Sequence, residues 1–254
     1  MPCQSSRTPS SPRPSRSELD RLEATLGRRF RIVSVPVEVS GHRLAIIRPE
    51  SSESLISEED FERDERLPYW AELWPSALIL ARHVGSLDGR GRSLLELGCG
   101  VGLVAASASR AGFEVTATDY YADALLFTRL NVMRSSGRAP TVMELDWRAI
   151  PTTLGKFDVV VGSDVLYERR YPALIASVIA RALEPGGIAL VADPGRVAAP
   201  ELPAECEQHG LTVHERHAVP FVDGTVRQSI DVITIGWSAQ ERNHGAIGEL
   251  QVPG

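Results

Sequence analysis

A glycine-rich segment in the middle of the chain has the residue types needed to cradle a ligand. It reads Glu96-Leu97-Gly98-Cys99-Gly100-Val101-Gly102 and lies between a predicted strand and a predicted helix. Glycines at alternate positions let the backbone turn sharply and let a ligand approach where a Cβ atom would clash. Asp119 ends the next predicted strand, where its carboxylate can accept hydrogen bonds from ribose hydroxyls. The pattern therefore predicts a nucleoside-binding site.

The spacing of the glycines narrows the class of ligand. A dinucleotide fingerprint needs a glycine at its sixth position for close helix packing, and that position is Leu103, which disfavours NAD. The sequence also lacks the GxxxxGK[ST] loop that binds phosphates. The acidic Glu96 is poorly suited to a pyrophosphate but well suited to a cation. S-adenosylmethionine, which carries a sulfonium and an ammonium group, is such a ligand.

Two further predicted strands end in polar and aromatic residues. Asp146 and Trp147 follow the third strand, where an acid can accept from an adenine amino group and an aromatic ring can lie against the base. Asp164 follows the fourth strand, three residues before Tyr167, so one helical turn brings both to one side. Structural alternatives stay open at this point: Trp147 as a core residue, Asp164 as a helix cap and Tyr167 as packing.

The elements that must position these residues alternate from Arg92 onward. Strands are predicted at 93–97, 114–119, 141–145, 157–162, 188–192, 211–215 and 227–237, and helices at 101–111, 122–135 and from Pro172 to a stop at Glu184-Pro185-Gly186-Gly187. Such alternation predicts an α/β fold, doubly wound, with a mostly parallel seven-stranded Rossmann-like sheet covered by helices on both faces. Ligands bind beyond the carboxyl ends of such strands, so we expect the motifs above to converge there.

The N-terminal region has a different organisation. Residues 1–17 are rich in Ser, Pro and Arg and are predicted to be a disordered tail. Residues 18–66 are predicted to hold a helix that begins at a capping box of Ser17 and Asp20 and runs to Gly27, a β-hairpin with a turn at Gly41, and an acidic segment at 50–66. We interpret that segment as a solvated linker or helix face rather than an acidic docking site. Residues 67–237 form the main domain, and 238–254 a C-terminal tail.

Composition excludes several classes of function. The chain has 254 residues, with 33 acidic and 27 basic side chains and a formal net charge of −6, which argues against general affinity for nucleic acid or anionic membranes. No apolar stretch approaches the length of a membrane span. The three cysteines fit neither a disulfide framework nor a CxxC zinc pair, and the six histidines lack metal spacing, so we expect no metal. Without a signal-peptide pattern, we expect a cytoplasmic location.

Other catalytic chemistries find little support in the sequence. Gly162-Ser163 lacks the G-x-S-x-G elbow of serine hydrolases. Cys99 is interpreted as a small buried side chain rather than a nucleophile, because no histidine accompanies it in the pattern.

The ordered set of motifs resembles a known family. The E-x-G-x-G-x-G loop, the acid after the second strand, the Asp-Trp pair and the Asp-x-x-Tyr pair resemble the seven-strand, class I S-adenosylmethionine-dependent methyltransferases. Asp164-x-x-Tyr167 is similar to the hallmark of the family 16 protein lysine methyltransferases. A further set of motifs is similar to the electron transfer flavoprotein β-subunit lysine methyltransferases and their bacterial relatives: Pro68-Tyr69-Trp70-Ala71, Trp74-Pro75 and Asp193-Pro194-Gly195-Arg196. The resemblance covers roughly 67–237.

The resemblance implies S-adenosylmethionine as cofactor, a protein presenting a lysine as partner, and a role for each matched residue. Asp119 would hold the ribose, Asp146 and Trp147 would meet adenine, and Trp74 and Ser76 would border the methionine end. The glycine loop would surround the methionine moiety, and Ser163 would lie at the acceptor side with the catalytic pair. The complete implied set is Trp74, Ser76, Glu96, Gly98, Cys99, Gly100, Gly102, Asp119, Tyr120, Asp146, Trp147 and Ser163 for the cofactor, with Asp164 and Tyr167 as catalytic residues.

Methyl transfer to an amine is an in-line displacement that needs mainly positioning. We hypothesise that Asp164 binds and orients the incoming ammonium, while Tyr167, Tyr69 and Trp70 wall the channel and favour the neutral amine. Two rival functions remain: a small-molecule N- or O-methyltransferase on the same fold, and a non-catalytic scaffold. The sequence leaves open the target protein, the degree of methylation, the oligomeric state and the role of the N-terminal hairpin.

Overall fold

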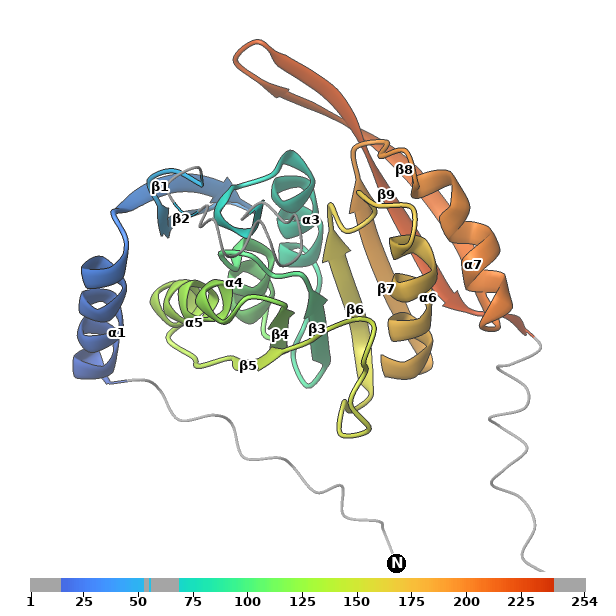
Figure 1. The fold of residues 1–254 in the computed structure, drawn as a ribbon, viewed down its shortest axis with the longest axis horizontal. Helices are drawn as coiled ribbons and strands as arrows, with labels where there is room; N and C mark the ends of the chain where they lie inside the picture. Colours follow the sequence, from blue (N-terminus) through green and yellow to red (C-terminus); the bar gives the residue numbers. More distant parts are fainter. Residues whose placement is uncertain (1–14, 53–54, 56–68, 240–254) are drawn as a thin grey trace, which may run out of the picture.

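The computed structural model describes residues 15–52, 55 and 69–239. Within them, a seven-stranded sheet with the strand order β5-β4-β3-β6-β7-β9-β8 forms the centre of the molecule (Figure 1). The first five strands in this order are parallel, whereas β9 runs antiparallel to both β7 and β8. The strands are β3 (Ser93–Leu97), β4 (Glu114–Asp119), β5 (Thr141–Glu144), β6 (Phe157–Ser163), β7 (Leu183–Asp193), β8 (Leu211–Asp223) and β9 (Val226–Trp237).

Helices cover both faces of this sheet, which confirms the predicted fold class. Neighbouring residues on β3 point to opposite faces. Leu94 packs in the hydrophobic cluster that includes α3 (Pro75–Gly85), α4 (Leu103–Arg110) and α5 (Ala122–Ser136). Leu95 packs in the cluster that includes α6 (Tyr171–Ala182) and α7 (Leu202–Gln208). Among the residues that the structure describes, no helix has both the length and the apolar character needed to cross a membrane.

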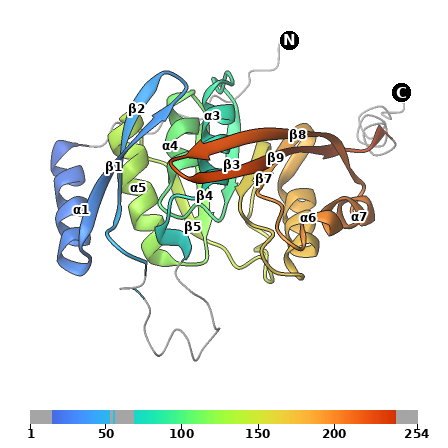
Figure 2. The ribbon, with the colours of Figure 1, turned by 90° about the horizontal axis from the view of Figure 1, so that it is seen from above.

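The N-terminal elements form a separate layer against α5 (Figure 2). Helix α1 (Arg16–Arg29) precedes strands β1 (Ile32–Val39) and β2 (His42–Pro49), which pair antiparallel and confirm the predicted hairpin. The predicted cap at Ser17 is wrong: Ser15 caps α1, and its Oγ accepts a hydrogen bond from the N–H of Glu18 at 3.1 Å. Ser15 with Glu18 has the spacing of a capping box, so α1 begins two residues earlier than expected and continues past Gly27.

Some elements differ from the sequence-based expectation. Helices α3 and α7 were not predicted, and β8 is longer than 211–215, so that β8 and β9 form the long hairpin that projects past the sheet in Figure 1. The segment 184–187 does end α6, but it belongs to β7, where the pairing with β6 shifts register between Phe157 and Val159. The predicted tails lie largely outside the described residues, which begin at Ser15 and end at 239, and so does most of the acidic segment.

Candidate active site

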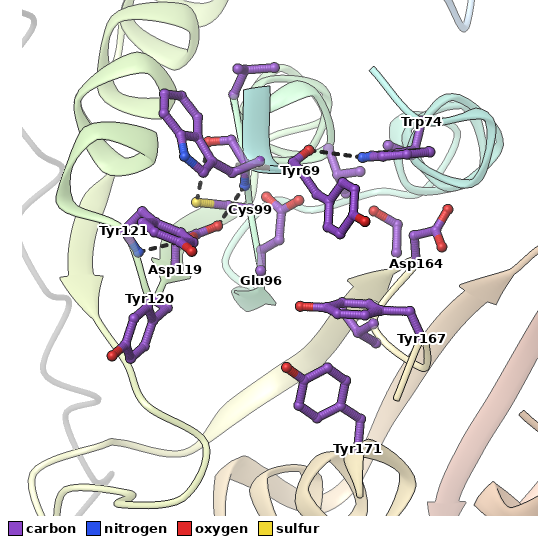
Figure 3. Close-up of a pocket in the computed structure, with 18 of the residues that line it drawn as sticks. Tyr69, Trp74, Glu96, Cys99, Asp119, Tyr120, Tyr121, Asp164, Tyr167 and Tyr171 are labelled. Atoms are coloured by element: carbon purple, nitrogen blue, oxygen red, sulfur yellow. Dashed lines mark hydrogen bonds between the residues drawn. The ribbon is translucent and has the colours of Figure 1, made fainter. Parts of the chain in front are cut away.

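A cavity of about 460 Å³ opens at the carboxyl ends of the parallel strands (Figure 3). It lies where β3 and β6 are neighbours and the chain order reverses, which is the switch point of a doubly wound sheet. The 3-10 helix η2 (Tyr69–Ala71) and the start of α3 contribute the remaining side. Twelve predicted site residues line the cavity: Trp74, Glu96, Gly98, Cys99, Gly100, Asp119, Tyr120, Asp146, Trp147, Ser163, Asp164 and Tyr167. Ser76 and Gly102 lie outside its lining.

The glycine loop has the backbone that its sequence indicates. Gly98, Gly100 and Gly102 have φ angles of +65°, +53° and +81°, a region that side-chain-bearing residues rarely adopt. A Cβ atom on Gly100 would come within 2.8 Å of the Trp70 carbonyl oxygen, and one on Gly102 within 2.7 Å of the Thr128 Cα atom. The absence of a side chain at Gly100 thus lets the glycine loop approach the Trp70 carbonyl in the cavity wall. The absence of one at Gly102 lets α4 pack closely on α5.

Asp119 is fixed at the end of β4 by the glycine loop itself. Its Oδ2 atom accepts a hydrogen bond from the N–H of Gly100 at 2.9 Å, and its Oδ1 atom accepts one from the N–H of Tyr121 at 3.0 Å. Burial raises the pKa of this carboxyl, and these backbone N–H groups oppose the shift. A carboxylate has about four acceptor positions, so Asp119 keeps acceptor capacity toward the cavity.

Glu96 is a buried acid whose side chain enters the cavity wall (Figure 3). The residue is 1% exposed, and among the described residues its Oε2 atom has no hydrogen-bond partner. Burial raises the pKa of Glu96 well above its ordinary value, and the nearby Asp119 raises it further. The backbone hydrogen bond from Ala105 opposes this shift. A buried carboxylate oxygen without a partner is costly, which makes this position suited to a cationic ligand group.

Cys99 is a buried thiol rather than a reactive thiolate. Thr128 Oγ1 donates to its Sγ atom at 3.2 Å and also contacts the Gly100 carbonyl at 2.9 Å. Burial is the largest cause of the strongly raised pKa of Cys99, and the carboxylates of Asp119 and Glu96 add to it. A nucleophilic cysteine needs a lowered pKa, so the geometry agrees with the small buried side chain inferred from the sequence.

Asp146 and Trp147 follow β5, and the next residue, Arg148, pairs with the Asp146 carboxylate. Arg148 Nη2 contacts Asp146 Oδ2 at 2.7 Å, and Arg148 Nε contacts both carboxylate oxygens, at 2.9 and 3.0 Å. The guanidinium also lies 6.0 Å from the ring centroid of Tyr120. On the other side, the Trp147 ring approaches Gly98, where a Cβ atom would lie 3.5 Å from Trp147 Cζ2. Arg148 was not singled out from the sequence.

Asp164, at the end of β6, is held by an ion pair. Its Oδ1 atom lies 2.7 Å from Arg196 Nε, and its Oδ2 atom accepts a hydrogen bond from Ser76 Oγ at 3.3 Å. The backbone at Asp164 has a φ of +59°, which is unusual for a residue with a side chain. Ser76 is fully buried and does not line the cavity. Its hydrogen bond to Asp164 therefore holds the carboxylate from the protein interior.

Aromatic rings form a continuous wall from one side of the cavity to the other (Figure 3). Successive rings meet edge to face, with centroids 4.7 to 6.1 Å apart, a geometry that aromatic pairs prefer. Trp74 Nε1 also donates to the Tyr69 carbonyl at 2.9 Å, which fixes one end of the wall. The rings in order are Trp74, Tyr69, Tyr167, Tyr171 and Trp147.

Sequence reasoning missed several lining residues. Tyr171 is the first residue of α6, whereas Tyr167 lies in the irregular segment after β6, so no helical periodicity indicates that the two rings meet. Arg196 belongs to a motif noted only for its resemblance. The other additional lining residues are mostly apolar and carry no local signal: Leu73, Ala77, Val101, Leu103, Val104, Leu145, Val165 and Leu174, with Glu72 and Tyr121.

Comparison with known proteins connects this geometry to methyl transfer. A protein-family model described as a methyltransferase domain matches residues 65–233. Protein N-lysine methyltransferase METTL21A of Danio rerio is 35% identical over 123 residues, covering 45% of this chain and 56% of that protein. The electron transfer flavoprotein beta subunit lysine methyltransferase of Rattus norvegicus is 30% identical over 159 residues, covering 60% of each. The chain spans about half the length of the curated relatives it matches.

Relatives with other acceptors and a solved structure complete the comparison. A ubiquinone biosynthesis O-methyltransferase of Nitrosococcus oceani is 29% identical over 119 residues, covering 44% of this chain and 47% of that protein. The crystal structure of a TehB-like SAM-dependent methyltransferase from Corynebacterium glutamicum superposes with a TM-score of 0.52 at 20% identity. It covers 63% of this chain and 87% of the other, and it supports the fold alone.

Proposed function

We propose that this chain, which belongs to the methyltransferase-domain family matched over residues 65–233 and uses S-adenosylmethionine, methylates the side-chain amine of a lysine in a protein. Relatives named as protein-lysine methyltransferases support this acceptor. The single observation that carries the proposal is Asp164, a buried carboxylate beside an aromatic wall at the cavity. An acid at this position favours a cationic amine over a neutral hydroxyl.

The residues present fit S-adenosylmethionine. Among the described residues, the Oε2 atom of Glu96 has no hydrogen-bond partner, so it can face the cationic methionine end. Asp119 retains acceptor capacity for ribose hydroxyls, and the Trp147 ring lies beside Gly98. Both oxygens of Asp146 contact Arg148, but a carboxylate has about four acceptor positions, so Asp146 keeps acceptor capacity for the adenine role that the resemblance implies.

The reaction needs little acid-base machinery from the protein. When bound, the cofactor supplies an activated methyl group and a neutral thioether as leaving group. The protein must hold the acceptor nitrogen in line, and such positioning can supply up to about 7–11 kcal/mol of the barrier. Asp164 keeps acceptor positions beyond those that Arg196 and Ser76 use, so it can orient the acceptor amine. Tyr167 and Tyr69 line one side of the cavity with aromatic surface.

The proposal is tested by label transfer. Purified protein, methyl-labelled S-adenosylmethionine and a host extract are incubated, and macromolecules are separated from small solutes before counting. We expect label in discrete protein bands that resists ester-cleaving base and is lost with Asp164→Asn. The matched control is Asp88→Asn, which changes an exposed carboxylate paired with Arg90 outside the cavity and should transfer label like the unmodified chain.

Self-labelling is easily separated from transfer to a partner. Lys156 is the only lysine in the sequence, and its Nζ atom donates to the carbonyls of Ala180 and Leu183 at 3.2 and 3.1 Å. Lys156 directly precedes Phe157, the first residue of β6, whereas the cavity lies at Ser163, the last residue of that strand. The two ends of the strand are about 20 Å apart. Label on the enzyme itself is therefore not expected.

The alternative is methylation of a small molecule. The similarity to a ubiquinone biosynthesis O-methyltransferase supports this alternative. Label confined to small solutes would favour it. Absence of any transfer, together with absence of S-adenosylhomocysteine binding by calorimetry, would refute both acceptor classes.

A further inference from the structure

Arg196 places a positive charge beside Asp164, the carboxylate to which we assign the orientation of the acceptor amine. From its contacts we propose that Arg196 pairs with Asp164 in order to keep an incoming lysine in its neutral, nucleophilic form, making Arg196 a positioning and charge-tuning residue of the transfer. This inference rests on the proposed function. It concerns how a carboxylate can orient an amine without also trapping it as an ammonium ion.

The position of Arg196 is built by three separate contacts. Its Nε atom lies 2.7 Å from Asp164 Oδ1, and its guanidinium carbon lies 5.6 Å from the ring centroid of Trp74. Its backbone N–H donates to Asp193 Oδ1 at 2.7 Å, and the N–H of Gly195 donates to the same atom at 2.8 Å. The loop after β7 is thus anchored by Asp193, and the side chain is held between a carboxylate and an aromatic face.

The charges around this position explain why a cation is needed. Asp193 is fully buried, and within the part of the chain that the structure describes its Oδ2 atom has no hydrogen-bond partner. Glu96 also lines the cavity, and Tyr69 and Tyr167 are the titratable groups from η2 and from the segment after β6. Asp193 lies outside the cavity lining, and burial raises its pKa, so the charge that faces the acceptor is that of Asp164. Without Arg196, Asp164 would present an uncompensated negative charge to the cavity. Such a charge raises the pKa of a bound lysine and stabilises its protonated form.

Only the neutral amine can react. The acceptor first releases one proton to solvent. Its lone pair then forms the nitrogen–carbon bond while the carbon–sulfur bond breaks with its electron pair on sulfur, and the positive charge moves to nitrogen. Arg196 acts before this step: its charge offsets part of that of Asp164. Asp164 can then still attract a lysine side chain and accept a hydrogen bond from its amine, but with less preference for the ammonium form. The side chains of Arg196 and Asp164 are 36% and 7% exposed, and both residues line the cavity.

The test is the pH dependence of methyl transfer to the protein acceptor identified by mass in the labelling experiment. For Arg196→Gln, we expect the acidic limb of the kcat profile to move up by about one pH unit, and KM for the acceptor to fall. Arg196→Lys retains the charge and should keep the limb near that of the unmodified chain. Arg196→Met serves as a second neutral variant, and S-adenosylhomocysteine binding checks that each variant is folded.

Three outcomes overturn the inference. The first is a neutral variant with lower kcat but an unmoved acidic limb, which would make Arg196 purely structural. The second is a limb that moves in the opposite direction, and the third is an equal shift in Arg196→Lys. If the unmodified chain transfers no methyl to protein amines, the proposed function itself fails. That failure is visible before any variant is measured.

Discussion

The side-chain amide of Asn131 on α5 pairs with both backbone polar groups of Ile47 on β2. Its Oδ1 atom accepts from the Ile47 N–H at 2.8 Å, and its Nδ2 atom donates to the Ile47 carbonyl at 2.7 Å. The same Nδ2 atom donates to the carbonyl of Val101 in the glycine loop at 2.8 Å. One buried side chain therefore connects the N-terminal hairpin to the loop that shapes the cavity, which gives the hairpin a structural role in the site.

Asn131→Ala should destabilise the chain by about 2–4 kcal/mol, because it leaves three buried backbone groups without their partner. Urea unfolding followed by circular dichroism measures the change. Arg134→Ala on the same helix is the matched control. It breaks a half-exposed ion pair with Glu23, which is worth about 0–1 kcal/mol. Equal losses in the two variants would show that Asn131 does not anchor the hairpin.

Gly100→Ala should weaken S-adenosylhomocysteine binding at least about tenfold, as measured by calorimetry. The new Cβ atom would come within 2.8 Å of the Trp70 carbonyl and would displace either the loop or η2. Gly137→Ala is the control, since Gly137 has a similar φ of +69° but no described atom within 4 Å of the added Cβ. Both variants carry a backbone cost of roughly 1–2 kcal/mol. Unchanged ligand affinity in Gly100→Ala would contradict the account of the loop.

Glu96→Gln should separate stability from binding. Burial raises the pKa of Glu96 in the folded chain. At pH values between the unfolded and the folded pKa, the folded state therefore holds a proton on Glu96 that the unfolded state has lost. This contribution to stability is full below the unfolded pKa and is lost as the pH rises toward the folded value. Without ligand, the Tm of Glu96→Gln should therefore be higher than that of the unmodified chain at pH 8. The difference between the two Tm values should be smaller at pH 5.

The same variant should bind S-adenosylmethionine more weakly, because the charge that faces the cationic methionine end is gone. Calorimetry at pH 8 checks this. A Tm difference that shrinks with rising pH, or an unchanged affinity for S-adenosylmethionine, would show that Glu96 does not serve as a buried counter-charge.

The parts of the fold that were predicted are those with a strong local signal. Strands β3 and β4 lie at the predicted residues, because short apolar runs there are bounded by Gly and polar residues. Helix α3 was missed although Pro75 stands at its first turn, a position that proline favours. The cap at Ser15 was missed because Ser17, two residues later, offered a competing local pattern.

The candidate site was only partly predictable for a different reason. The glycine loop and the acids after the strands are local motifs, and the topology brings them together without further information. The Asp164–Arg196 pair joins residues 32 positions apart in sequence, and Ser76 reaches the same carboxylate across 88 positions. Neither contact follows from periodicity or spacing, since each depends on how loops from different strands meet.

The central claim is most directly tested by identifying the methylated amino acid. Protein labelled with methyl-labelled S-adenosylmethionine in a host extract is hydrolysed, and the amino acids are separated against methylated standards. The account predicts that label from the unmodified chain elutes with methylated lysine and disappears with Asp164→Asn. Label in methyl esters, in another amino acid or only in the small-solute fraction would contradict it.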